Sequence, residues 1–312
     1  MKLSILIPTY NRAEFLIKNL NILASFIKDT NHLNLIEIVI GNNRSTDNTD
    51  NLVNKFILDN ELININYFLN KNNIGLEKNA LTVLDKANSK FVMYLGDDDY
   101  LDFGYFEKIL HSLDNISNLS CIIPNYIPIT KEGAILGNGR DDNETTVISN
   151  KGFLNCLNNS WRGHQLSGLV FKREGLLEAY KKHNISNIYP FIFFVSYSCL
   201  NGKTLHIIEY PVQVTQPGQE NKNWGYGNDG LITEIFDNYI KLPINNYKKT
   251  RLQLRQYNKQ SWRLRMYYHK NKKDFLNAFF NIWLNKNGTF LFKILFPIYI
   301  FYIFLYFKIK SF

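Results

Sequence analysis

Four apolar runs in the first 125 residues constrain the fold more than any other feature of this sequence. They read "KLSILI", "IEIVI", "INYFL" and "KFVMYL", and each is followed by a polar cluster and then by an amphipathic stretch of helical length. Continuous apolar strands that alternate with amphipathic helices indicate parallel βαβ units, with helices covering both faces of the sheet. We therefore predict an α/β domain with a Rossmann-like, largely parallel mixed sheet.

The polar clusters indicate where a ligand binds. "PTYN", "GNNRSTD", "NKNNIG" and "GDDD" follow the four apolar runs in order. The carboxyl ends of parallel strands meet at one edge of a sheet, and ligands of open α/β folds bind there. We expect the four loops to converge on one site.

The rest of the chain is less regular. We interpret "GHQLSGLVF" and "KTLHIIEYPVQV" as strands, and "REGLLEAYKKH" and "DGLITEIFDNYI" as helices. The long stretch "TQPGQENKNWGYGNDG" is typical of a functional lid or of a disordered loop. We assign residues 1–240 to one domain, with halves 1–125 and 126–240, and residues 241–312 to a helical tail.

The tail is strongly basic. Residues 241–312 contain 15 Lys or Arg and one acid, Asp274, whereas the first 240 residues contain 21 basic and 26 acidic residues. This asymmetry suggests an anionic surface as a partner. The three cysteines form no CxxC pair, which favours reduced thiols.

The end of the tail favours a membrane over nucleic acid as that partner. The uninterrupted apolar run Ile294–Phe307 has 14 residues, fewer than the ~20 that a spanning helix needs. It favours a helix lying in the interface, with Lys308 and Lys310 at the head groups. We expect a peripheral or monotopic protein on the cytoplasmic face of the inner (plasma) membrane. The alternative is a helical subdomain that buries the tail without a membrane.

Asp97, Asp98 and Asp99 close the fourth apolar run. Like charges this close disfavour ionisation unless a cation compensates them. Carboxylates suit Mg²⁺ or Mn²⁺, which bind protein through one or two acids plus substrate phosphates. The alternative is a solvated acidic turn, with Asp102 capping the next helix. P-loop and GxGxxG patterns are absent, and a receiver domain would carry acids where this chain has "PTYN".

Three segments carry a resemblance to a known family. "LSILIPTYNRAEFL", "IEIVIGNNRSTDNT" and "NNIGLEKNALTVLDKANSKFVMYLGDDDYL" resemble, in order and spacing, the N-terminal motifs of family 2 glycosyltransferases of the bacterial surface-glycan type. The resemblance covers about the first third of the chain. It implies a GT-A fold and a nucleotide-sugar donor.

The resemblance also implies roles for single residues. The first loop would contact the base and ribose, and Asn42 would meet the base at a position where the family usually has Asp. Lys78 would approach the diphosphate. Asp97 would face the ribose, with Asp98 beside it, and Asp97 and Asp99 would hold Mn²⁺ or Mg²⁺. The implied donor-binding residues are Pro8, Thr9, Tyr10, Asn11, Asn42, Lys78, Asp97 and Asp98.

The catalytic base is the main departure from the family pattern. The family commonly places an acidic pair about 90 residues after the metal site, but the corresponding stretch, "NISNIYPFIFFVSYS", contains no acid. We consider Asp229, which is equally suited to cap a helix, and His164 as substitutes. Other candidates are Glu220, Glu234, Asp141, Asp142 and Glu174, and Trp161 and Trp224 are candidates for stacking on sugar rings.

The expected activity is a metal-dependent, inverting transfer of a sugar to a glycan acceptor. The tail and the resemblance together favour a lipid-linked acceptor in surface polysaccharide or glycoconjugate biosynthesis. The alternative is a non-catalytic nucleotide-sugar-binding or assembly subunit at the membrane, because the missing acidic pair is what such a protein would show. A third hypothesis is a metal-dependent nucleotide-sugar hydrolase.

Overall fold

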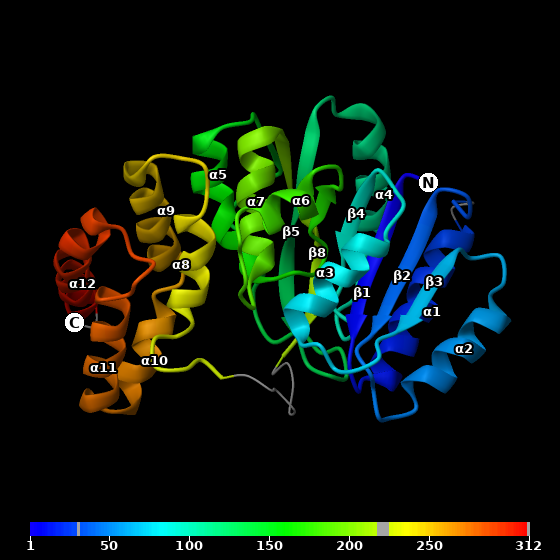
Figure 1. Cartoon of the computed structure of the whole chain (residues 1–312), viewed down its shortest axis with the longest axis horizontal. Helices are drawn as coiled ribbons and strands as arrows, with labels where there is room; N and C mark the ends of the chain where they lie inside the picture. The colour runs from blue at the N-terminus through cyan, green and yellow to red at the C-terminus, as the bar shows by residue number, and fades with distance from the viewer. Residues whose placement is uncertain (30–31, 217–224, 311–312) are drawn as a thin grey trace.

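A computed structural model describes residues 1–29, 32–216 and 225–310 of the chain, and Figure 1 shows its arrangement. Its central feature is an eight-stranded sheet with the order β3-β2-β1-β4-β7-β5-β8-β6. Glu220 and Trp224, and with them the middle of the expected lid, lie outside the described residues.

The first half of the chain builds the parallel part of this sheet. Strands β1 (Leu3–Thr9), β2 (Ile36–Asn42), β3 (Ile65–Leu69) and β4 (Phe91–Tyr94) pair in parallel, with β1 between β2 and β4. The helices that follow them are α1 (Ala13–Asp29), α2 (Thr49–Asp59), α3 (Leu76–Lys86) and α4 (Phe103–Asn115). The alternation that we predicted from the four apolar runs is confirmed.

The second half completes a mixed sheet. β7 (Val170–Lys172) is antiparallel to both β4 and β5 (Leu119–Ile129), and β5 runs parallel to β8 (Lys203–Thr215). The short β6 (Val147–Ser149) is antiparallel to β8. The prediction of a strand over "GHQLSGLVF" is wrong at its beginning, because a 3₁₀ helix, η1 (Ser160–His164), occupies that part. η1 follows α5 (Phe153–Asn159) without a break.

Helices cover both faces of the sheet. One core contains the inward side chains of α1, α2 and α4. The other contains those of α3, α6 (Leu176–Lys182) and α7 (Pro190–Asn201). This arrangement explains why the parallel strands are apolar on both sides.

The basic tail folds onto the second core. It comprises α9 (Asn246–Lys259), α10 (Trp262–Lys270), α11 (Lys272–Trp283) and α12 (Phe290–Lys310), after α8 (Ile232–Ile240). Tyr257, Leu264, Ile282 and Phe292 belong to the same buried cluster as α7. In Figure 1 these helices form the end of the molecule farthest from α2 and β3. Among the described residues, no helix is both long and apolar enough to cross a membrane.

Candidate functional site

The acidic triplet lies where β4 ends, beside the end of β1. Asp97, Asp98 and Asp99 are only 7%, 8% and 5% exposed, so the turn is not a solvated one. Asp102 separately caps α4 by accepting a hydrogen bond from the backbone N–H of Gly104 at 2.7 Å. Three buried carboxylates therefore remain for another role.

Two residues of the first loop contact the triplet. The hydroxyl of Thr9 donates to Asp97 Oδ2 at 2.7 Å. Arg12 forms an ion pair with Asp98, and its guanidinium nitrogen lies 3.9 Å from Asp97 Oδ1. Arg12 was missed by our sequence analysis, although it directly follows "PTYN". It brings one positive charge to three acids.

Asp99 is held by the second half of the chain. Its Oδ2 accepts hydrogen bonds from the Ser167 hydroxyl and from Gln165 Nε2, the latter at 3.1 Å. Its Oδ1 accepts the backbone N–H of Thr215, at the end of β8, at 3.0 Å. Residues from two neighbouring segments thus fix the orientation of this carboxylate.

Burial makes the triplet reluctant to ionise. The pKa of Asp97 and of Asp99 is raised to about 7. Loss of solvent is the larger cause, and repulsion from Asp98 is the second. The site contains three desolvated acids and a single guanidinium group, so its negative charge is not fully compensated. Mg²⁺ and Mn²⁺ prefer hard oxygen ligands such as these carboxylates. The residues present therefore fit a divalent cation.

Hydrogen bonds join the four loops, as the sequence predicted. The side chain of Asn11 accepts the backbone N–H of Thr46 at 2.7 Å, which ties the first loop to the second. Asn43 donates to Asn73 Oδ1 at 2.8 Å and accepts the backbone N–H of Ile74 at 2.9 Å, which ties the second to the third. The Thr9–Asp97 bond ties the first to the fourth.

The remaining donor-site candidates differ in their surroundings. Asn42 is buried, donates to the Tyr67 hydroxyl at 2.9 Å and accepts the backbone N–H of Ser45 at 2.8 Å. Pro8 and Tyr10 are half-buried at this edge, and Lys78 is exposed in the first turn of α3. Nothing in these contacts assigns a ligand to them individually.

Asp229 occupies a capping position. It accepts the backbone N–H groups of Leu231 at 3.0 Å and of Thr233 at 2.9 Å, and the Thr233 hydroxyl as well. These bonds hold the start of α8, which is the structural alternative that the sequence left open.

His164 is a neutral imidazole. Its Nδ1 lies 3.0 Å from the carbonyl oxygen of Trp161; a carbonyl only accepts, so Nδ1 carries the proton and Nε2 is unprotonated. The pKa of His164 is lowered to about 3, mainly by burial and secondly by the positive charge of Arg140. The ring stacks on Trp161 with a centroid distance of 6.1 Å.

Acidic side chains of other segments lie beside residues 186–188, which lie just before α7 and include no acid. Glu234 of α8 accepts the backbone N–H of Ile188, and burial, with Asp237, Asp229 and Glu77 nearby, raises its pKa. Asp237 accepts a hydrogen bond from Asn187 at 3.1 Å. Glu77, at the start of α3, accepts one from the Ser186 hydroxyl at 3.1 Å. Sequence spacing does not reveal this convergence, because the acids come from α3 and α8, two segments far from residues 186–188 in the sequence.

The start of α7 is close to the triplet. A side chain added at Gly163 would meet the backbone of Phe191 at 2.5 Å, so η1 packs directly on the first turn of α7. Gln165, two residues later, contacts Asp99. Through η1 and Gln165, the start of α7 is thus connected to the triplet.

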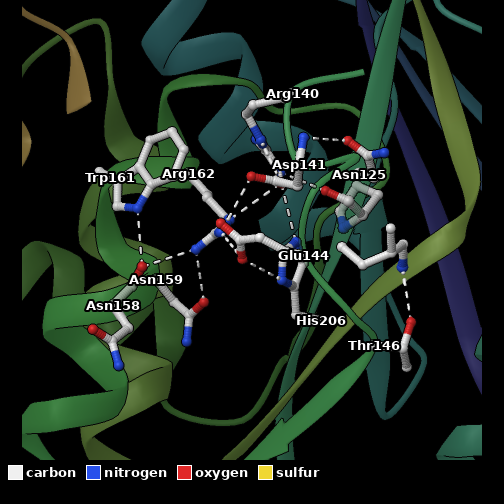
Figure 2. Close-up of polar contacts among 12 residues, drawn as sticks. Asn125, Arg140, Asp141, Glu144, Thr146, Asn158, Asn159, Trp161, Arg162 and His206 are labelled. Atoms are coloured by element: carbon white, nitrogen blue, oxygen red, sulfur yellow. Dashed lines mark hydrogen bonds and ion pairs between the residues drawn. The ribbon is translucent and has the colours of Figure 1, made fainter. Parts of the chain in front are cut away.

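A second polar cluster, drawn in Figure 2, is structural. The ligand atoms of Asp141, Glu144 and His206 lie within 4.8 Å of one another. Arg140 and Arg162, however, already pair with Asp141 at 2.7 and 3.1 Å. Burial opposes ionisation of Asp141, but its bonds to His206 and the two arginines outweigh it and hold its pKa well below the usual range. The cluster needs no added cation.

Other sequence candidates also have structural roles in or near this cluster. Trp161 is buried, with Arg162 4.6 Å above its ring, and its Nε1 donates to the Asn158 carbonyl. Asp142 accepts from Asn125 at 2.8 Å. Glu174 is exposed and pairs with Lys172.

The family model described as "Glycosyl transferase family 2" matches residues 4–157, the segment that contains the four loops and the acidic triplet. Residues 4–157 form a family 2 glycosyltransferase domain. The resemblance stated from the motifs is confirmed.

Two curated relatives agree with this assignment. Abequosyltransferase RfbV of Salmonella typhimurium is 29% identical over 80% of this chain and 76% of its own length. GalNAc(5)-diNAcBac-PP-undecaprenol beta-1,3-glucosyltransferase of Campylobacter jejuni is 31% identical over 49% of this chain. The match spans about half of that relative, 47% of its length.

Solved structures confirm the predicted GT-A fold. Staphylococcus aureus TarS 1-349 in complex with UDP-GlcNAc superposes with a TM-score of 0.68 at 18% identity, covering 91% of this chain and 81% of that one. The mannosyltransferase PcManGT from Pyrobaculum calidifontis, in complex with GDP-Man and Mn²⁺, gives 0.58 at 10% identity, with coverages of 91% and 88%. At these identities the likeness concerns the fold.

Proposed function

We propose that this glycosyltransferase moves a sugar, with inversion, from a nucleotide-sugar donor to a lipid-linked glycan in bacterial surface polysaccharide or glycoconjugate biosynthesis. The observation that carries the donor half of this proposal is the buried acidic triplet at the edge where four loops meet. The acceptor half is supported by the basic tail and by the name of the Campylobacter relative.

Asp97 and Asp99 would hold Mn²⁺ or Mg²⁺, as their raised pKa and shortage of positive charge suggest. When bound, such an ion stabilises negative charge on a leaving diphosphate. Thr9 and Arg12 orient Asp97 and Asp98, and Gln165, Ser167 and Thr215 orient Asp99.

The donor would lie along the joined loops. The first loop would contact the nucleoside through Pro8, Thr9, Tyr10 and Asn11, and Asn42 would meet its base. The side chain of Lys78 is exposed and free to turn toward a diphosphate. Their place at the carboxyl edge of β1, β2 and β3 supports these roles.

Glu234 is the best-supported base for the acceptor hydroxyl. It is half-buried, its pKa is raised, and it contacts the backbone at Ile188, where the family usually carries its own acids. Asp229 is committed to capping α8, and the low pKa of His164 makes its Nε2 a weak proton acceptor. We therefore rank Glu234 ahead of both.

The donor test is turnover of UDP-, CDP-, GDP- and dTDP-sugars, with Mn²⁺ and with EDTA. We expect release of one nucleoside diphosphate that EDTA abolishes, and that Asp97→Asn with Asp99→Asn reduces at least about 100-fold. Asp102→Asn is the matched control, because Asn caps a helix as well as Asp does. Equal turnover with and without metal would refute the role given to the triplet.

The base test compares Glu234→Gln, Asp229→Asn and His164→Gln. Loss of general-base catalysis typically costs about 10²–10⁴-fold, and we expect this in kcat for Glu234→Gln, with donor affinity retained. A non-catalytic donor-binding subunit is the alternative, favoured by the acid-free stretch "NISNIYPFIFFVSYS". It predicts donor binding without turnover in every variant and in the wild type.

We also propose that the protein acts as a peripheral or monotopic protein at the cytoplasmic face of the inner membrane. The charge of residues 241–312 supports attraction to anionic lipid.

A further inference from the structure

Helix α9 presents a row of basic side chains. They are three or four residues apart, a spacing that places them on one side of a helix, and α9 contains no acid. Within the part of the chain that the structure describes, no acidic side chain forms an ion pair with any of them. The row consists of Lys248, Arg251, Arg255 and Lys259.

An open pocket of about 300 Å³ lies beside this row, between α5, α9 and α12. Two arginines line this pocket, and its surface is mostly apolar. The lining residues are Leu157, Arg251, Leu254, Arg255, Asn258 and Tyr299. In Figure 1 α9 and α12 lie side by side at the end of the molecule away from the parallel strands.

Arg255 points to the kind of ligand. Its Nε is buried, and within the described residues it donates to no acceptor. A buried donor without an acceptor is costly, and a phosphate oxygen would satisfy it. Guanidinium groups bind phosphate through several N–H groups at once, so Arg251 and Arg255 together suit a phosphate ester.

The outward side of α12 indicates that the phosphate belongs to a lipid. Phe292 and Phe296 bury one side of this helix. On the other side, spaced three or four residues apart, four apolar side chains are exposed: Phe290 (82%), Ile294 (48%), Ile298 (65%) and Phe301 (68%). Exposed apolar stripes mark interaction surfaces, and an apolar face beside basic residues is typical of a helix that lies in a membrane interface.

We propose that the pocket binds the phosphate headgroup of an anionic phospholipid in a bilayer surface, with the outward face of α12 against the acyl chains. A second copy of the chain fits this surface less well, because residues 241–312 carry 15 basic residues and one acid and would repel each other. This inference rests on the membrane association proposed above and gives it a site. The pocket shares no residue with the acidic triplet or with its contacts.

The test is partition of the full chain onto vesicles of phosphatidylcholine with about one quarter phosphatidylglycerol, compared with phosphatidylcholine alone. The test variant is Arg251→Gln with Arg255→Gln. The matched control is Lys272→Gln with Lys273→Gln, which removes the same charge from exposed positions at the start of α11. Circular dichroism checks folding, and Gln retains helix propensity.

We expect the arginine pair to weaken partition about 30-fold and the lysine pair less than about 3-fold. Ile298→Ser with Phe301→Ser, both at exposed positions, should weaken it about tenfold or more. Equal losses for the two charge pairs would mean diffuse attraction and would overturn the pocket. Binding of glycerol phosphate that the arginine pair abolishes, together with no preference of the wild type for anionic vesicles, would overturn the lipid in favour of a soluble phosphate.

Failure of this inference is separable from failure of the glycosyltransferase proposal. Nucleoside diphosphate release is measured without vesicles, and vesicle partition is measured without a donor. A protein that turns over donor but ignores anionic vesicles refutes only the lipid site.

Discussion

The proposed divalent ion at Asp97 and Asp99 predicts that its removal destabilises this protein in a pH-dependent manner. The pKa values of Asp97 and Asp99 are about 7 in the folded, metal-free protein, against about 4 in an unfolded chain. The folded state therefore binds more protons than the unfolded state between about pH 4 and pH 7. Its stability must rise as the pH falls through this window and be lowest above about pH 8.

The size of the effect follows from the burial of the triplet. A shift of one pKa unit corresponds to about 1.4 kcal/mol, and a rise of roughly three units gives about 4 kcal/mol if the coupled pair is counted once. A bound divalent ion removes this dependence, because it stabilises the ionised carboxylates. At 100 times its dissociation constant it would add about 2.7 kcal/mol.

The assay is urea unfolding at pH 8 and pH 5.5, with EDTA and with Mn²⁺. We expect the free energy of unfolding in EDTA to be about 2–4 kcal/mol greater at pH 5.5, after subtraction of the same difference in the Asp97→Asn/Asp99→Asn variant. Mn²⁺ should stabilise the wild type chiefly at pH 8. A wild type that follows the double variant at both pH values, or a Mn²⁺ effect equal at both, would refute the reasoning.

Three further predictions concern single positions. Gly96→Ala places a Cβ 2.9 Å from Asp99 Oδ2 and 3.1 Å from Ser167 Oγ, so Mn²⁺ affinity in a calorimetric titration should fall at least tenfold; unchanged affinity would show that Asp99 moves freely. Asp141→Asn leaves the buried Arg140 without a carboxylate partner, while Arg162 keeps Glu144. It should cost about 3–5 kcal/mol in urea unfolding, whereas exposed Asp142→Asn should cost under about 1 kcal/mol. Similar losses would contradict the role of the buried cluster. Gly230→Ala meets Arg263 Cβ at 2.8 Å with a φ of +64° and should lower stability by about 1–3 kcal/mol; a neutral result in thermal unfolding would indicate that α10 yields.

The sequence predicted the parallel half of the sheet because its signals are local. Each apolar run is followed by a helical period within the next few residues, so strand, loop and helix are legible without any distant contact. The last two residues of η1, Gly163 and His164, were predicted as strand, and the structure shows that Gly163 packs directly against α7.

The tail shows a different limit. Its charge and its apolar end were evident from composition, and both favoured a membrane partner. Composition does not tell which apolar side chains are covered, and the structure buries Tyr257, Phe292 and Phe296 in the core shared with α7. The outward side of α12 stays exposed and is available to a partner.

The sequence by itself determined where the four loops and the acidic triplet meet. Parallel strands have their carboxyl ends at one edge, so a polar loop after each strand must contribute to the same site, and the triplet of acids identifies its chemistry. The tertiary structure decided how those acids are held and what faces them. Ser167 and Thr215 reach Asp99 from 68 and 116 residues away, and Glu234 meets residue 188 from another helix. Such pairings arise when separate segments pack around one core, and local sequence patterns carry no record of them.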